Sequence, residues 1–247
     1  MELENKTMIS PFYRVKCLFA GNQSVGKSSL INLLEKNVHN PDILVTIGIE
    51  FISMKIKLTE YPLLRQIPEF YFESTKNFED DTKCQAISCS FWDLSGQAKY
   101  FSIVKSYLRD TDICFLVFDM NRRETWNDLE RWKTEVTNNS KNSNFPLLVL
   151  IGTKSDLKSF EVTYDEINER AEKWNAKFYV LSCIGQDASL IIRKMFYKTI
   201  LSYHEKIISM LYSGQELPSH VLTSFYQKET EELNLNVPIK PNYCCHQ

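Results

Sequence analysis

Short apolar runs alternate along the chain with segments whose hydrophobic residues recur every three or four positions. The apolar runs predict strands at Arg14–Ala20, Ile49–Leu58, Gln85–Trp92, Asp112–Phe118, Pro146–Ile151 and Phe178–Ser182. The helical pattern predicts helices at Lys27–Lys36, Arg123–Asn138, Thr163–Asn175 and Ala188 to about Tyr212. Near-continuous apolar strands separated by helices are typical of parallel sheets covered on both faces. We therefore expect an α/β domain with a central, mostly parallel six-stranded sheet and helices on both faces.

Three regions fall outside this alternation. Residues 59–83 separate the second and third strands with aromatic, proline and acidic residues, a stretch too long for a plain hairpin turn. This insertion can fold onto the domain, form a partner surface or stay mobile. Residues 213–247 are polar and non-periodic, which predicts a flexible tail, and residues 1–12 form an N-terminal extension.

Composition excludes several classes of protein. With 247 residues, 43% hydrophobic and 24% charged, the chain suits one soluble domain. A net charge of −2 argues against nucleic acid as the main partner. The N-terminus shows no secretory signal, and no apolar run approaches the length of a membrane-spanning helix. Five cysteines in or beside strands, without metal-ligand spacing, are expected to be reduced thiols: Cys17, Cys84, Cys89, Cys114 and Cys183.

The strongest chemical signal follows the first strand. Gly21-Asn22-Gln23-Ser24-Val25-Gly26-Lys27-Ser28 has the spacing of a phosphate-binding loop between a strand and a helix. Its glycines let successive backbone N–H groups approach phosphate oxygens, and the helix that follows adds the positive end of its dipole. Lys27 would reach the outer phosphates and the Ser28 hydroxyl would bind Mg²⁺, with Ser29 beside it in the same site.

Two further segments complete a phosphate and metal site. Thr46 lies 18 residues after Ser28 and would lend its hydroxyl to Mg²⁺ and its N–H to a γ-phosphate. Asp93, at the end of the third strand, suits the metal shell. Gly96 leaves an N–H free for the γ-phosphate, and Gln97 would orient the attacking water as the catalytic residue. Taken alone, Thr46 is merely a threonine before a strand; the phosphate loop supports the functional interpretation.

A base-reading loop is expected after the fifth strand, at Thr153-Lys154-Ser155-Asp156. The Asp156 carboxylate would accept two hydrogen bonds from guanine, whereas adenine would leave it unpaired. The stem of Lys154 would lie over the base plane. After the last strand, Ser182-Cys183-Ile184 would present the Cys183 N–H to guanine O6, or forms an ordinary strand-to-helix turn.

On these motifs the chain resembles the Ras superfamily of small GTPases, and within it a Rab protein, over roughly residues 12–205 and the last four residues. The resemblance implies a P-loop nucleoside triphosphatase domain at 13–212 that binds GDP or GTP with Mg²⁺ and is monomeric. It implies that Phe51, Trp92 and Tyr107 form an exposed aromatic triad read by effectors; the alternative is that these rings belong to the core. An exchange factor, a GTPase-activating protein (GAP) and an escort protein or GDI are further expected partners.

The sequence departs from the family pattern at several site positions. Gln23 stands where many members have a small residue, near the expected entry of a GAP arginine, and Ala98 replaces the usual glutamate. Thr153 replaces the usual asparagine. His39 takes the place of the phenylalanine that stacks on guanine, and Ile184 that of a lysine. These changes predict slower hydrolysis and weaker nucleotide affinity than the family norm.

The C-terminal Cys244-Cys245-His246-Gln247 resembles the double-cysteine prenylation signal of Rab proteins. One lipid binds membranes only marginally, and the tail lacks a basic patch, so two prenyl groups on Cys244 and Cys245 are expected. A single farnesyl on Cys244 is the alternative. The resulting prediction is a GTP-hydrolysing switch on the cytoplasmic face of an intracellular membrane, with the Golgi or endosomes as candidate compartments. A scaffold that holds GTP constitutively is the second hypothesis.

Overall fold

The computed structural model describes residues 14–36, 46–57, 86–140, 146–215, 217, 218 and 221. Its six strands are β1 (Arg14–Ala20), β2 (Ile49–Lys57), β3 (Ala86–Leu94), β4 (Ile113–Asp119), β5 (Leu147–Thr153) and β6 (Lys177–Val180). Its helices are α1 (Lys27–Lys36), the 3-10 turn η3 (Ala98–Tyr100), α3 (Phe101–Lys105), α4 (Arg123–Asn127), α5 (Leu129–Asn138), α6 (Tyr164–Lys173) and α7 (Ala188–Tyr212).

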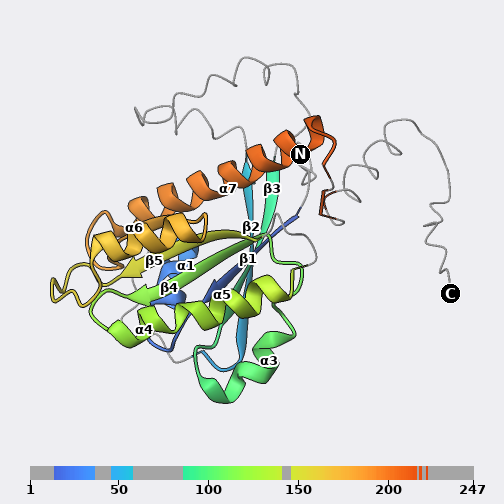
Figure 1. Ribbon diagram of the computed structural model, residues 1–247. Helices are drawn as coiled ribbons and strands as arrows, with labels where there is room; N and C mark the ends of the chain where they lie inside the picture. Colours follow the sequence, from blue (N-terminus) through green and yellow to red (C-terminus); the bar gives the residue numbers. More distant parts are fainter. Residues whose placement is uncertain are drawn as a thin grey trace, which may run out of the picture.

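The strands form one sheet in the order β2-β3-β1-β4-β5-β6 (Figure 1). Strand β2 runs antiparallel to β3, and every other neighbouring pair is parallel. The expected α/β fold with a mostly parallel six-stranded sheet is confirmed. Because five strands run in the same direction, the loops that follow them meet at one edge of the sheet, where ligands bind in folds of this kind.

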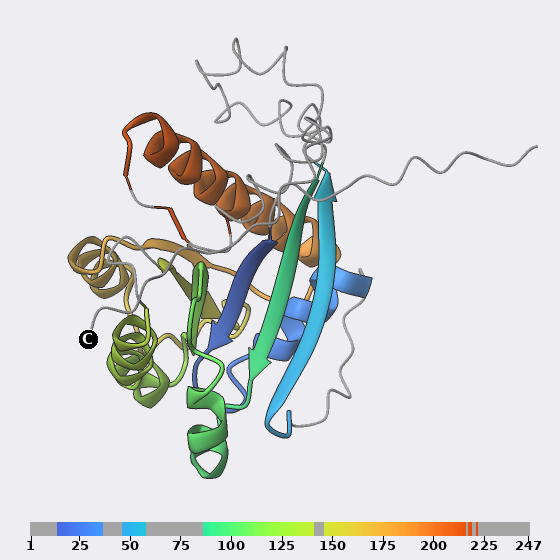
Figure 2. The ribbon, with the colours of Figure 1, turned by 90° about the vertical axis from the view of Figure 1, so that its right-hand side faces the viewer.

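Helices cover both faces of the sheet, and each face has its own apolar core (Figure 2). Alternate residues of β1 divide between them: Val15, Cys17 and Phe19 join α1 and α7, whereas Leu18 and Ala20 join the core under α4, α5 and α6. Helix α7 packs Phe196 against Phe19 and Phe115, whose ring centroids lie 4.7 Å apart. The period-two alternation of the strands thus builds a three-layer molecule.

Local chemistry explains several element boundaries. Thr163 accepts a hydrogen bond from the backbone N–H of Glu166, whose side chain bonds back to the Thr163 N–H, so a capping box starts α6. The helix predicted at Arg123–Asn138 is divided into α4 and α5 at Asp128. Strand β3 continues to Leu94, two residues beyond the prediction, so Asp93 is part of the sheet rather than of the loop.

The structure also adds elements that hydrophobic periodicity did not predict. Residues 98–105 form η3 and α3, which are too short to show a helical period. Leu217 and Val221, placed in the flexible tail by the sequence, are buried against the core that α7 covers. The N-terminal extension, the insertion at 59–83, His39 and the two C-terminal cysteines lie outside the described residues.

Candidate functional site

The loop between β1 and α1 wraps around the side chain of Lys27. Lys27 is buried, and its Nζ donates to the carbonyl oxygens of Gly21 at 2.9 Å and Asn22 at 2.7 Å. Burial lowers the pKa of Lys27 to about 8, although the charge of Asp93 opposes this shift. A buried ammonium group held in position by two carbonyl oxygens can bind an anion at this loop.

The backbone of this loop has the conformation that an anion-binding turn needs. Ser24 and Gly26 have φ angles of 60° and 97°, in the left-handed region. Alternation of right- and left-handed residues turns successive N–H groups toward one point. Gly21 is required for a second reason, because a Cβ there would lie 2.1 Å from the carbonyl oxygen of Val117. The predicted phosphate site at residues 21–29 therefore has the geometry of a phosphate nest.

Three oxygen-bearing side chains converge beside the start of α1. The Ser28 hydroxyl lies 2.9 Å from that of Thr46 and donates to Asp93 Oδ2, to which Thr46 also donates at 3.1 Å. Burial raises the pKa of Asp93, while the Ser28 hydrogen bond and the Lys27 charge act in the opposite direction. Asp93 Oδ1 is buried without a hydrogen-bond partner among the described residues.

This arrangement fits a magnesium ion. Mg²⁺ prefers oxygen ligands and binds to few protein groups, because phosphate oxygens and water complete its octahedral shell. The two hydroxyls and the buried Asp93 carboxylate, one of whose oxygens has no hydrogen-bond partner among the described residues, are a donor set suited to such an ion. No group of three or more His, Cys, Asp or Glu side chains gathers within the described part of the chain, so a carboxylate-rich metal site is not found there.

The loop after β3 lies directly against the phosphate loop. A Cβ on Gly96 would come within 2.2 Å of the Asn22 carbonyl carbon and the Gln23 nitrogen, so only glycine fits. The Ser95 N–H donates to the Gly48 carbonyl at 2.8 Å, which joins this loop to the segment that carries Thr46. Gln97 caps η3 and is partly exposed beside Gly96. Sequence-distant segments around 24, 46 and 96 thus meet.

Thr153 connects the predicted base-reading loop, residues 153–156, to the phosphate loop. Its hydroxyl lies 2.6 Å from the Val25 carbonyl oxygen and 2.9 Å from that of Phe118, and its side chain is fully buried. The loop continues with Lys154 in the left-handed region, at φ 59°. Lys154 Nζ donates to Asp119 Oδ2 at 2.7 Å, so its stem is extended toward β4.

Asp156 lies at the surface beside the turn that follows β6. The Ser182 hydroxyl donates to Asp156 Oδ1 and accepts from the Ile184 N–H at 2.9 Å. Ser182 and Cys183 are partly buried, and Ile184 is 61% exposed. Burial raises the pKa of the Cys183 thiol to about 12, with a smaller contribution from the Asp156 charge, so this cysteine is a neutral thiol. The two predicted base-site segments therefore lie in contact.

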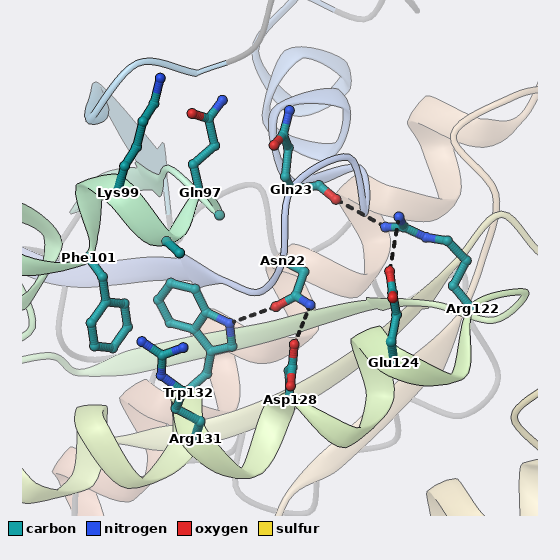
Figure 3. Close-up of a pocket in the computed structure, with 12 residues that line it drawn as sticks. Asn22, Gln23, Gln97, Lys99, Phe101, Arg122, Glu124, Asp128, Arg131 and Trp132 are labelled. Atoms are coloured by element: carbon teal, nitrogen blue, oxygen red, sulfur yellow. Dashed lines mark hydrogen bonds and ion pairs between the residues drawn. The ribbon is translucent and has the colours of Figure 1, made fainter.

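Sequence reasoning missed the side chain of Asn22. Its Oδ1 accepts from Trp132 Nε1 at 3.3 Å, and its Nδ2 donates to Asp128 at 2.6 Å (Figure 3). These contacts fasten the phosphate loop to α5 at the point where Asp128 divides the helix. They border a cavity of about 600 Å³ that Gln23, Gln97, Lys99 and Arg122 also line. Asn22 and Gln23 of the phosphate loop and Gly96 of the loop after β3 thus face the same cavity.

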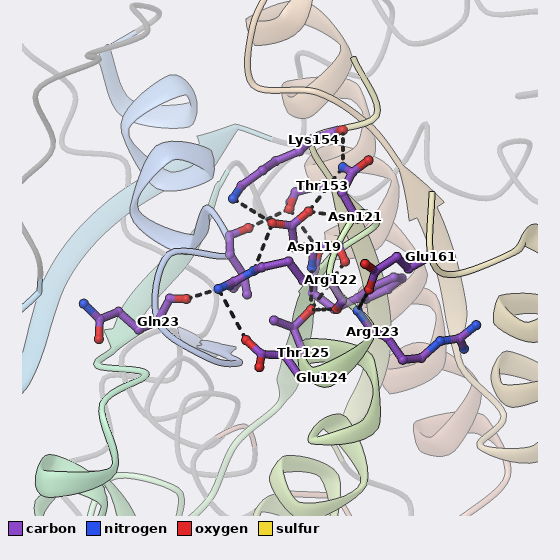
Figure 4. A network of polar contacts seen from close by, with 12 residues as sticks. Gln23, Asp119, Asn121, Arg122, Arg123, Glu124, Thr125, Thr153, Lys154 and Glu161 are labelled. Carbon is purple, nitrogen blue, oxygen red and sulfur yellow. Dashed lines mark hydrogen bonds and ion pairs between the residues drawn. The ribbon is translucent and has the colours of Figure 1, made fainter. Parts of the chain in front are cut away.

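Sequence reasoning also missed a polar network at the end of β4 (Figure 4). Asp119 is buried, accepts hydrogen bonds from Lys154 and from the Asn121 N–H at 3.0 Å, and forms an ion pair with Arg122. Burial alone would raise the pKa of Asp119, but the hydrogen bonds from Lys154 and Asn121 outweigh it and hold the pKa below its usual value. The position of Asp119 at the carboxyl end of a strand, like Asp93, was the available signal.

The three aromatic residues expected to meet effectors form one continuous surface. The ring centroids of Phe51 and Trp92 lie 4.8 Å apart, and those of Trp92 and Tyr107 lie 5.3 Å apart. Phe51 is 53% exposed and Tyr107 is 37% exposed, whereas Trp92 is partly buried. The alternative that Phe51 and Tyr107 belong to the core is excluded.

Among the described helices, none has the length and apolar character to cross a bilayer. The family model for the Ras family matches residues 16–204. A curated relative, the Ras-related protein Rab-11A of Dictyostelium discoideum, is 27% identical over 209 residues, which cover 84% of this chain and 80% of that protein. The family match includes all of the sheet except the first two residues of β1, and every site segment described above. The chain therefore belongs to the Ras family of small GTPases and is Rab-like.

Proposed function

We propose that this protein is a molecular switch that binds GDP and GTP with Mg²⁺, hydrolyses GTP to GDP and phosphate, and acts at a membrane in vesicle traffic. The observation that carries the proposal is the convergence of Ser28, Thr46 and Asp93 beside a buried Lys27. These groups come from three separate segments, and a Mg-bound triphosphate explains why they meet.

Each residue has a defined role in this proposal. Lys27 and the amides of residues 21–26 would hold the phosphates, and Gly96, packed against the backbone of Asn22 and Gln23, would offer its N–H to the outermost one. Ser28 and Thr46 would ligate the metal while Asp93 orients its shell. Bound magnesium neutralises charge that develops on the phosphate oxygens. Gln97 would position the attacking water, since phosphoryl transfer depends on positioning and charge stabilisation more than on a strong base.

Guanine selection would rest on Asp156. Its carboxylate would accept two hydrogen bonds from the base, and the Ser182 bond holds it beside the turn that carries Cys183. His39 would lie in the base site as well, outside the described residues. The exposed Ile184 offers no cation, which supports the expectation of weaker binding than in relatives with lysine there.

Switching would act through the segments around Thr46 and Gln97. The Ser95–Gly48 hydrogen bond ties them together, so loss of the γ-phosphate contacts at one segment would release the other. Phe51 and Trp92 lie on β2 and β3, which adjoin these segments, and Tyr107 lies in the turn after α3. The surface that the three rings form would report the change to an effector.

Membrane attachment would depend on prenyl groups at Cys244 and Cys245, with a cytosolic pool held by an escort protein or GDI. The test is mass spectrometry of the C-terminal peptide from native protein, compared with a Cys244→Ser/Cys245→Ser variant. Two isoprenoid masses on the native peptide support the proposal, one farnesyl supports the alternative, and an unmodified peptide contradicts both.

The second candidate function is a scaffold that retains GTP with little turnover. It is favoured by Gln23 and Ala98, which both line the cavity beside Gln97. A bulky residue near the expected entry of a GAP arginine would remove a rate enhancement of about 10³–10⁵. Nucleotide content after purification separates the two: a switch retains mostly GDP, and the scaffold retains GTP.

Single-turnover hydrolysis tests the enzyme directly. The Gln97→Leu variant should hydrolyse bound GTP at least about tenfold more slowly than the native protein, because a leucine cannot orient water. The Ser28→Asn variant should favour GDP or the nucleotide-free form. Glu169→Ala, at an exposed position of α6, is the control. Hydrolysis at the native rate in Gln97→Leu would remove that residue from the mechanism.

A further inference from the structure

We propose that Arg122 is a positioning residue of the phosphate loop, which holds the peptide group between Gln23 and Ser24 so that its N–H faces the β-phosphate. This inference rests on the proposed nucleotide site and assigns a function to a residue outside the sequence motifs predicted for that site. Its basis is the side chain of Arg122, which links the loop after β4 to the loop after β1 (Figure 4).

The contact is to a backbone carbonyl. Arg122 Nη2 donates to the carbonyl oxygen of Gln23 at 3.0 Å. In a trans peptide the C=O and the following N–H point in opposite directions. A guanidinium that fixes the Gln23 carbonyl on the outer side of the loop therefore fixes the Ser24 N–H on the inner side. Ser24 has the left-handed φ of 60° that turns this N–H into the nest.

The arginine is itself held in place. Its Nε lies 3.3 Å from Asp119 Oδ2, and its Nη1 lies 3.5 Å from Glu124. Asp119 is buried at the end of β4, where the Asn121 N–H and Lys154 also bond to it. The rigid sheet thus provides an anchor for a guanidinium that is 39% exposed. A lysine could not reproduce this pattern, because a single ammonium group cannot contact Gln23, Asp119 and Glu124 at once, as the planar guanidinium does.

A second carbonyl of the same loop is held in the same way. Thr153 donates to the Val25 carbonyl, which fixes the Gly26 N–H, as Arg122 fixes that of Ser24. Arg122 follows β4 and Thr153 ends β5, so the two anchors come from the two strands that succeed β1 on one side in the sheet order. Left-handed backbone is unfavourable at a non-glycine residue, and an anchored carbonyl offsets part of that strain at Ser24. Arg122 also carries positive charge, which strengthens the N–H of the peptide as a donor.

The experiment compares GDP with GMP, because the amides of a phosphate loop cradle the second phosphate, which GMP lacks. Competition against a fluorescent GDP gives both affinities for the native protein, Arg122→Ala, Arg122→Lys and the control Arg123→Ala. Arg123 is a neighbouring arginine that pairs with Glu166, away from the loop. The amide ¹⁵N shift of Ser24 in the GDP complex, with Gly26 as internal reference, gives a local readout.

In Arg122→Ala the preference for GDP over GMP should fall about tenfold, in Arg122→Lys it should fall less, and in Arg123→Ala it should not change. The Ser24 shift should move while that of Gly26 stays. An unchanged preference, or an equal loss for both nucleotides, would overturn the inference. Should Arg122→Ala not fold, Arg122→Lys gives the same comparison. If the native protein binds neither nucleotide, the proposed function fails instead.

Discussion

At the scale of single residues, the site depends on positions where only one side chain fits. Gly96 is the clearest, since the space for a Cβ is filled by the backbone of Asn22 and Gln23. Asn22 is another, because both ends of its amide have partners on α5 or at the break before it. In both cases the constraint comes from a contact between segments distant in sequence.

Gly96→Ala should separate catalysis from binding. The added methyl forces the loop after β3 away from the phosphate loop, so the backbone N–H of residue 96 and the side chain of Gln97 shift from their positions. We expect GTP hydrolysis to fall about tenfold or more, a change of about 1.4 kcal/mol or more in the barrier, while GDP affinity stays within about threefold. Single-turnover hydrolysis and GDP titration measure the two, with Glu169→Ala on α6 as control. Equal losses in both would show that Gly96 acts on the whole site.

His204 should make stability depend on pH. Burial lowers its pKa in the folded protein to about 4, from the usual 6.5. Between these values the unfolded chain binds more protons, so the free energy of unfolding should fall as pH drops from 6.5 toward 4, by about 2–3 kcal/mol. Urea unfolding at several pH values measures this for native protein and His204→Leu. A pH slope that is identical in the two proteins would contradict the assignment.

At the scale of elements, α4, α5 and α6 are joined by stacking on the face of the sheet opposite α7. The Arg170 guanidinium lies 3.7 Å from the ring centroid of Trp126 and 5.3 Å from that of Trp174. It also donates to the Trp126 carbonyl at 2.5 Å. The arginine therefore fixes α6 against α4, which begins directly after the Asp119 network.

Arg170→Ala should weaken this junction. Cation–π contacts contribute about 0.5–2 kcal/mol depending on their exposure, and the carbonyl would lose its donor. We expect a loss of about 1–2 kcal/mol in the free energy of unfolding, seen as a lower midpoint in urea, and a change in tryptophan emission. Glu169→Ala, at an exposed position one residue earlier on the same helix, should have little effect. Equal midpoints for the two variants would show that the stacking adds nothing.

The elements themselves were largely predictable from sequence. Strand β1 and helix α1 have the predicted bounds, because an apolar run, a glycine-rich turn and a leucine-rich helix each give a strong local signal. η3 and α3 were missed because they are too short for periodicity, and α4 and α5 were merged because Asp128 is no strong helix breaker. The burial of Leu217 and Val221 is a tertiary contact that no local pattern encodes.

The candidate site was predictable where a motif carries its own spacing. That Lys27, Ser28 and Asp93 lie close together could be expected from the phosphate loop and from the strand-end position, while their roles remain predictions. Arg122 and Asn22 could not, because their partners lie about 100 residues away in the sequence. Lys154 was expected to place its side-chain stem over the base plane. The contact of its Nζ with Asp119 was not expected, because only the pairing of β4 with β5 brings the two residues together.

At the scale of the whole molecule, the parallel sheet brings the chemistry to one edge. The order β3-β1-β4-β5-β6 places Asp93, the phosphate loop, the Asp119 network and the predicted base-reading loop side by side along it. Thr153 and Arg122 then connect neighbouring loops across this edge. Phosphate and base would therefore bind to one rigid set of connected loops. The loops around Thr46 and Gln97 would be the segments that change conformation.

The most direct test of this account is calorimetric titration of the purified, nucleotide-free protein with GDP in Mg²⁺, with ADP as the matched nucleotide. The account predicts stoichiometric binding of GDP, no heat of binding with ADP, and a loss of GDP affinity of at least about a hundredfold in Lys27→Ala. A folded native protein that takes up neither nucleotide, or both equally, would contradict it.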